Sequence, residues 1–218
     1  MLFRSLTQQQ QKFYDTLKKH MIAVAAGEEI TTVNAAANLN KLLQLSAGAV
    51  YTDTGEIVSF DAKTRMTALM EVIEEASHKV IVFAPFRHAI EIIAEELRGN
   101  GVSCDVIHGG VSVNKRTEVF AKFQTEKDPH VLVIQPQAAS HGVTLHAANV
   151  VVWWGPVTST ETYLQANARV HRAGQRNPCT VVHIQGSAVE KRIYDMLSDK
   201  VDIHTRLIDL YKNIVETT

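Results

Sequence analysis

The chain has 218 residues, of which 45% are hydrophobic and 21% are charged, so it can bury one ordinary core, or two small ones, without disulfides. Its formal net charge of −1 at pH 7 excludes a global basic field, so any contact with nucleic acid must come from local side chains. No apolar run reaches the roughly 18 residues of a membrane span and the start shows no signal-peptide pattern, so we expect a cytoplasmic protein with no membrane partner.

The first part of the chain is predicted to be a mainly helical lead-in. Phe13, Leu17 and Met21 recur at four-residue spacing, which predicts an amphipathic helix over residues 7–26. A second helix, a turn between two short strands and a third helix are then expected, at residues 34–45, 51–56 and 62–77. We therefore place a domain boundary after residues 1–60.

From residue 79 the sequence alternates between short apolar runs and amphipathic stretches. Five runs have the composition of strands, namely residues 80–84, 102–107, 131–134, 150–154 and 180–184. Helices are expected between them, at 87–98, 112–123 and 163–175, and after a cap at 187–190. This alternation predicts an α/β fold with a parallel sheet, helices on both of its faces, and ligands at the carboxyl ends of the strands.

The loops that follow the predicted strands should meet at the carboxyl edge of the sheet. They are short and polar, and three of them carry glycine, which lets backbone amides approach an anion closely. These loops are residues 85–88, 108–110, 135–142 and 155–156.

The stretch from Tyr163 to Gln175 is predicted to be one helix that stops at Gly174. On such a helix Gln165, Arg169 and Arg172 fall within an arc of roughly 60°, opposite an apolar face. Two arginines without an acid between them repel each other unless an anion or a phosphate lies in front of them. The alternative is a surface helix with two solvated arginines.

The string Gln-Ala-x-x-Arg-x-His-Arg-x-Gly-Gln at residues 165–175 resembles the last helicase motif of the Swi/Snf-type ATPases in helicase superfamily 2. In that family the motif lies on the second of two RecA-like lobes and supplies arginine fingers to an ATP bound by the first lobe. The resemblance implies catalytic roles for Arg169, Arg172 and Gln165. It also implies that Gly142 lies with both arginines near the ATP.

The loops at the carboxyl edge fall where the family's other second-lobe motifs fall, so the resemblance spans nearly the whole chain. It implies a RecA-like lobe over residues 61–200 and an inter-lobe segment over 1–60. Apolar residues at helical spacing predict a C-terminal helix over 201–218. The resemblance also implies that the edge loops hold nucleic acid through its phosphates. The residues assigned to this contact are Phe86, Arg87, His88, His108, Gly109, Gly110, Lys115, Arg116, Gln137, Ser140 and His141.

One departure from the family pattern concerns Ser140 and His141, which replace a double glycine. The imidazole of His141 is either a direct contact to a phosphate or base, or a local structural exchange. A second departure is Thr144, which replaces an asparagine and should keep a hydrogen bond.

An ATPase of this class needs a Gly-x-x-x-x-Gly-Lys-Ser/Thr phosphate loop and an acidic strand end, and neither occurs in these 218 residues. We therefore expect ATP and Mg²⁺ to be held by a first RecA-like lobe, in the same full-length protein or in a separate chain. The isolated chain should be inactive. Two lone cysteines and scattered histidines predict no metal site.

The ending Arg-x-His-Arg-x-Gly-Gln favours the duplex-DNA branch of the superfamily over the RNA branch. The resemblance thus implies part of an ATP-dependent DNA helicase or translocase, with DNA and the first lobe as partners. The alternative is a nucleic-acid or protein binding module without ATPase activity.

Overall fold

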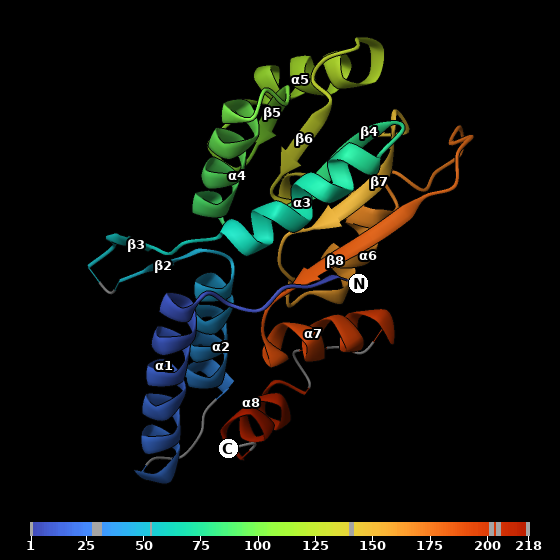
Figure 1. Cartoon of the computed structure of the whole chain (residues 1–218). Helices are drawn as coiled ribbons and strands as arrows, with labels where there is room; N and C mark the ends of the chain where they lie inside the picture. Colours follow the sequence, from blue (N-terminus) through green and yellow to red (C-terminus); the bar gives the residue numbers. More distant parts are fainter. Residues whose placement is uncertain are drawn as a thin grey trace.

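The computed structural model describes residues 2–27, 32–52, 54–139, 142–200, 203 and 206–216. It has a six-stranded parallel sheet with helices on both faces, in the order β1-β8-β7-β4-β6-β5 (Figure 1). The strands are β1 (Leu2–Phe3), β4 (Lys79–Phe83), β5 (Cys104–Ile107), β6 (Val131–Ile134), β7 (Ala148–Trp153) and β8 (Thr180–Gln185). The predicted α/β fold, with five predicted strands in a parallel sheet and helices on both faces, is confirmed.

The sixth strand, β1, was not predicted. It is two residues long and pairs in parallel with β8, with Leu2 opposite Ile184. Two residues are too few to show a period, so only the neighbouring strand identifies them as part of the sheet.

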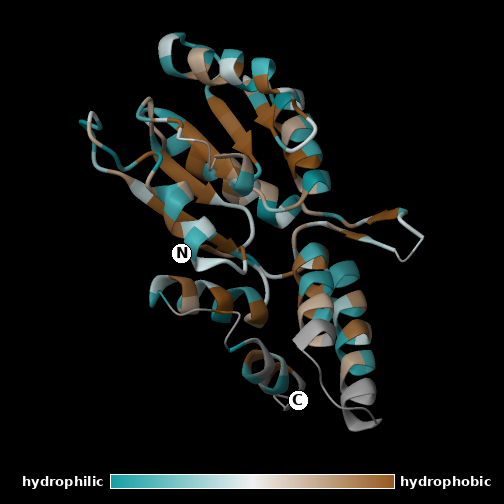
Figure 2. Ribbon diagram, turned by 180° about the vertical axis from the view of Figure 1, so that it is seen from behind, coloured by the Kyte–Doolittle hydropathy of each residue, from teal (hydrophilic) through white to brown (hydrophobic). Residues whose placement is uncertain are grey.

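Helices cover the two faces because successive side chains of a buried strand point in opposite directions. Val80 and Val82 pack in the core under α3 and α4, whereas Ile81 and Phe83 pack in the core that includes α5, α6 and α7. Figure 2 shows the brown, apolar strands enclosed between these helices. The helices are α3 (Lys63–Glu75), α4 (Arg87–Gly99), α5 (Val113–Thr125), α6 (Thr160–Asn167) and α7 (Ala188–Ser198).

Trp153 and Trp154 illustrate this double coverage. Both are fully buried, Trp153 in one core and Trp154 in the other. Trp154 donates from its indole nitrogen to the carbonyl of Ala47 at 2.9 Å. Adjacent tryptophans at the end of a central strand are both buried because both faces of the sheet are covered.

The lead-in forms two helices and a hairpin that lie beside the sheet (Figure 1). Its elements are α1 (Gln8–Gly27), α2 (Thr32–Ser46), β2 (Ala49–Tyr51) and β3 (Ile57–Ser59), and the C-terminal α8 (Leu207–Glu216) packs on α1 and α2. Tyr211 of α8 donates to the carbonyl of Met21 at 3.2 Å. The boundary after residue 60 stays a prediction.

The inward face of α1 differs in part from the predicted one. Met21 is fully buried as expected, but Phe13 is 47% exposed and Tyr14 turns inward in its place. Gln10 is also buried, and its amide donates to the carbonyl of Leu45 at 3.0 Å. The helix therefore docks on α2 partly through a polar side chain, which an apolar period does not reveal. No helix in the described parts of the chain combines the length and apolarity that crossing a membrane requires.

Candidate functional site

The predicted helix over residues 163–175 is wrong in its second half, because α6 ends at Asn167. Ser159 caps its start by accepting from the amide of Thr162 at 3.2 Å. Beyond Asn167 the chain continues as turns, and we call residues 168–175 the arginine segment. The carbonyl of Arg169 accepts from the amide of Leu145 at 2.8 Å instead of continuing the helical ladder.

Three further hydrogen bonds join the arginine segment to the loop before β7 and to the first residue of β7. Together with the bond between Leu145 and Arg169 we call them the latch. Arg172 donates to the carbonyl of Gly142 at 3.4 Å, so the two residues that the resemblance placed together do lie together. The side-chain amide of Gln175 donates to the carbonyls of His146 and Ala148, at 3.2 and 2.7 Å. Gln175 was in the quoted motif, but no role was predicted for it.

The latch also locates the arginines relative to the sheet. Ala148 is the first residue of β7, so Gln175 holds the arginine segment at the amino-terminal end of that strand. In Figure 1 the orange chain leading into β8 lies at the end of the sheet away from β2 and β3. The arginine segment therefore lies at the opposite edge of the sheet from the loops after β4, β5 and β7, at residues 85–88, 108–110 and 155–156, whereas the loop after β6 reaches the arginine segment through Gly142.

The expected grouping of Gln165 with the two arginines is not present. Gln165 donates to Glu161 on the same helix at 2.8 Å, because the early end of α6 removes the arc that the three residues would have shared. Arg169 is half-buried and Arg172 is exposed, so the structure places them in different surroundings.

At the carboxyl edge, the structure brings together two arginines and a histidine from different parts of the sequence. A Cβ placed on Gly110 would lie 3.1 Å from the ring of His108 and 3.6 Å from the guanidinium of Arg87. Burial, with Arg87 and Arg116 nearby, lowers the pKa of His108, against the opposing effect of Glu91. We call Arg87, His108 and Arg116 the basic edge.

The two arginines of the basic edge differ in how many of their donors are already used inside the protein. Arg116 braces the loop after β5, donating to the carbonyls of His108 and Gly109 at 3.1 Å each and to Val111 at 2.8 Å. This structural use was not predicted, and the predicted contact of Arg116 with nucleic acid stays a prediction. Arg87 is 61% exposed and pairs with Glu91 on the next turn of α4 at 2.9 Å.

The glycine amides of this loop are also engaged inside the protein. The amide of Gly109 donates to Gln135 at 3.1 Å, and that of Gly110 donates to Nδ1 of His108 at 3.1 Å. The expectation that these amides approach an anion directly is therefore wrong for the described conformation. Gln135, the first residue after β6, was predicted only as part of a loop.

His88 was predicted to contact nucleic acid, but its side chain is only 3% exposed. Its ring lies against Phe86 and Tyr51, with centroids 5.6 and 5.1 Å away. Burial lowers the pKa of His88 to about 4. The prediction is wrong for this side chain, because the β2–β3 hairpin brings Tyr51 over it.

The remaining candidates are dispersed. Lys115 is exposed and pairs with Glu118 at 2.7 Å, and Gln137 is exposed on the short 3-10 helix η1 (Pro136–Ala139). Ser140 and His141 lie outside the described residues, so their predicted contacts stay predictions.

The family profile described as "Helicase conserved C-terminal domain" matches residues 64–174, half of the chain. The chain belongs to this helicase family. It is 26% identical over 210 residues to an uncharacterized ATP-dependent helicase of Mycoplasma genitalium, covering 93% of this chain and 20% of the relative. It is 29% identical over 162 residues to the SWI/SNF-related matrix-associated actin-dependent regulator of chromatin subfamily A-like protein 1 of Xenopus tropicalis, covering 72% and 17%.

Two solved structures share the fold of this helicase lobe. The C-terminal part of the Fun30 ATPase domain has a TM-score of 0.74 and 15% identity, covering 100% of this chain and 97% of that one. The Sulfolobus solfataricus SWI2/SNF2 ATPase core in complex with dsDNA has a TM-score of 0.74 and 22% identity, covering 98% and 45%. The chain is a C-terminal lobe of the Swi/Snf type and spans about a fifth or less of the length of its curated relatives.

A buried ion pair between Arg65 and Glu190 lies at the carboxyl ends of β7 and β8. The guanidinium of Arg65 contacts both carboxylate oxygens of Glu190, at 2.7 and 2.9 Å, and also donates to the carbonyls of Trp154 and Ile184. Glu190 is fully buried and accepts from the amide of Ser187 at 3.0 Å, which completes the predicted cap of α7. These groups fill this part of the edge and stabilise the lobe.

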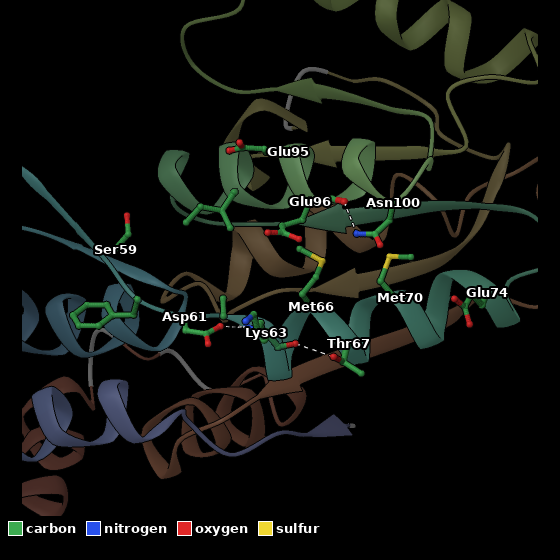
Figure 3. Close-up of a pocket in the computed structure, with 13 residues that line it drawn as sticks. Ser59, Asp61, Lys63, Met66, Thr67, Met70, Glu74, Glu95, Glu96 and Asn100 are labelled. Carbon is green, nitrogen blue, oxygen red and sulfur yellow. Dashed lines mark hydrogen bonds between the residues drawn. The ribbon is translucent and has the colours of Figure 1, made fainter.

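A cavity of about 650 Å³ lies between α3 and α4, apart from the candidate site (Figure 3). Met66 and Met70 face it from α3, and Glu95 and Glu96 lie along it on α4. None of the candidate site residues that the structure describes lines this cavity.

The stability of the helicase lobe is expected to depend on pH because two of its histidines are buried. Burial lowers the pKa values of His88 and His183 to about 4, from an ordinary 6.5. Below pH 6.5 the unfolded chain binds protons that the folded chain does not, so stability should fall towards pH 4, by about 1.4 kcal/mol per pH unit for each ring. Urea unfolding at a series of pH values measures this slope.

Two substitutions test the assignment of this slope. His88→Phe should reduce the slope by about half, because only the ring of His183 then resists protonation. His78→Gln is the matched control, since His78 is exposed, and it should leave the slope unchanged. A slope that is the same in all three proteins would contradict the prediction.

Proposed function

We propose that this chain is the second lobe of an ATP-dependent DNA helicase or translocase and donates Arg172, with Arg169, to an ATP held by an N-terminal RecA-like lobe. The observation that carries this proposal is the latch between the arginine segment and the loop at Gly142. Four hydrogen bonds hold the arginine segment against the loop, and Arg172 remains exposed at its surface. An exposed arginine on a fixed backbone suits the stabilisation of charge on a phosphoryl group in transfer.

The roles proposed for this chain and for the first lobe follow from where the residues lie. Arg172 neutralises charge that develops on the transferred phosphoryl group, and Gly142 keeps the guanidinium at the surface of the arginine segment. The first lobe supplies the phosphate loop and the Mg²⁺. No group of three histidine, cysteine or acidic residues in the described chain could hold a metal ion.

DNA is proposed to bind at the basic edge, through its phosphates. Arg87 is the exposed cation of the basic edge, and Lys115 in the first turn of α5 is a second exposed cation beside it. Arg116 holds the loop after β5 through its bonds to His108 and Gly109. A solved structure of the same fold is a complex with dsDNA, which supports duplex DNA as the partner. Movement of the basic edge relative to the first lobe during turnover would then produce translocation.

The test of this function is ATP turnover by the 218-residue chain alone, and then with a first lobe added, each with and without duplex DNA. The chain alone should show no turnover, and the added lobe should restore a DNA-stimulated rate. Turnover by the chain alone would contradict the two-lobed account. DNA binding without any restored turnover would favour the alternative, a binding module without ATPase activity.

DNA binding by the chain itself is expected to depend on Arg87. Arg87→Gln should weaken binding to duplex DNA and reduce the slope of log affinity against log salt by about 0.9, because one phosphate contact is lost. Fluorescence anisotropy across a salt series measures both quantities. Lys127→Gln removes the same charge from the loop before β6, at the opposite edge of the sheet, and should change neither.

A further inference from the structure

The loop after β5 holds the ring of His108 in one defined orientation. The amide of Gly110 donates to Nδ1 of His108 at 3.1 Å, and a Cβ on Gly110 would lie 3.1 Å from Cε1 and 3.2 Å from Nδ1 of the ring. These separations are tighter than ordinary van der Waals contact, so the ring lies directly against the glycine. A larger residue at position 110 would displace it.

The hydrogen bond determines which ring nitrogen carries the hydrogen. A nitrogen that accepts from an amide has no hydrogen of its own, so the neutral ring must carry its hydrogen on Nε2. Nε2 has no hydrogen-bond partner among the residues that the structure describes, and it is not among their buried unpaired atoms. It is therefore an available donor at the surface.

The charges around His108 favour the neutral ring. Arg87 from α4 and Arg116 from α5 both oppose a further positive charge, and Glu91 from α4 is the group that favours one. Protonation would also place a hydrogen on Nδ1 and break the bond from Gly110. A neutral donor thus takes the place of a third cation beside the two arginines.

We propose that His108 contributes to the DNA surface as a neutral hydrogen-bond donor, with its tautomer fixed by the amide of Gly110 and Nε2 directed to a backbone phosphate. This inference rests on the proposed DNA binding at the basic edge. It gives the phosphate contact a direction that an exposed arginine alone lacks. The contribution of His108 to binding is then independent of pH wherever the ring is neutral.

Two substitutions of His108 distinguish the contribution of Nδ1 from that of Nε2. Asparagine at position 108 offers an acceptor near the place of Nδ1 but nothing at the place of Nε2, whereas glutamine reaches the place of Nε2 with a donor. His108→Asn should weaken binding to a fluorescein-labelled DNA duplex by about two- to tenfold, the value of one such hydrogen bond. His108→Gln should bind closer to the unaltered chain. Amide exchange at Gly110 should show the reverse order, slow in His108→Asn and fast in His108→Gln.

The tautomer is measured without DNA, from long-range proton–nitrogen correlations in a chain labelled with ¹⁵N-histidine. The expected result at neutral pH is a hydrogen on Nε2 and none on Nδ1. A hydrogen on Nδ1, or a His108→Asn variant that binds the duplex as tightly as the unaltered chain, would overturn the inference. An unaltered chain that does not bind DNA at low salt would overturn the proposed DNA site as well, so the two failures are distinguishable.

The pH series provides the final comparison. The ratio of affinities between the unaltered chain and His108→Asn should stay constant above about pH 7.5, because a ring whose pKa is lowered from its ordinary value is neutral there. A ratio that grows as the pH falls would mean that His108 binds DNA as a cation, which would also overturn the inference.

Discussion

An Arg172→Ala variant of the two-lobed assembly is expected to hydrolyse ATP about 10³- to 10⁵-fold more slowly than the unaltered protein, the range typical of arginine fingers. The side chain is exposed and its single described hydrogen bond goes to Gly142, so its loss should change the free energy of unfolding by no more than about 0.5 kcal/mol. DNA affinity should remain near normal, because the arginine segment lies at the amino-terminal end of β7 whereas the basic edge lies at the carboxyl ends of β4 and β5. Steady-state turnover at saturating DNA, with anisotropy for DNA affinity, measures both.

The matched control is Arg176→Ala. Arg176 is exposed just beyond the arginine segment, so its removal deletes the same charge without removing the proposed finger. Turnover of this variant should stay near that of the unaltered assembly. Equal losses of turnover and DNA affinity in Arg172→Ala would contradict the proposed role, as would equal turnover losses in the two variants.

A Glu190→Ala variant is expected to lose about 3–5 kcal/mol of unfolding free energy, the usual cost of leaving one member of a buried ion pair without its partner. Arg65 would keep its charge at 3% exposure, and the amides of Gly186 and Ser187 would lose their acceptor. For a chain of this size the melting temperature should fall by about 6–20 °C. Urea and thermal unfolding of the 218-residue chain measure the loss.

Two further variants separate the buried charge from other effects. The double variant Arg65→Met/Glu190→Leu should be more stable than Glu190→Ala, because no unpaired charge remains. Lys191→Ala breaks an exposed pair with Asp195 on the same helix and should cost about 0.5 kcal/mol or less. A double variant as unstable as the single one would show that lost packing, rather than the charge, determines the effect.

The strands were predictable because their signal is local. Residues 131–134 form a continuous apolar run and become β6, with all four side chains buried. In contrast, β1 and the exposure of Phe13 depend on which distant segment packs alongside, and no period within the element contains that information.

The candidate site likewise has features that were predicted and features that were not. The motif at 165–175 and its pairing with Gly142 were predicted from the resemblance, and the contact between Arg172 and Gly142 is present. The geometry of the motif was not predicted, because the amide of Leu145, from a loop 24 residues earlier, takes the carbonyl of Arg169.

The α/β class and five strands of the main sheet were predictable from the sequence, since each depends on residues close together in the chain, and the arginine motif was identified by its resemblance to a known helicase motif. The tertiary structure alone decided that His88 is buried beneath Tyr51, that Arg116 braces a loop, and that the tautomer of His108 is set by Gly110. These outcomes depend on which donor meets which acceptor once the sheet has assembled. Hydrogen bonds act over about 3 Å in space, whereas a sequence pattern reports only separation along the chain.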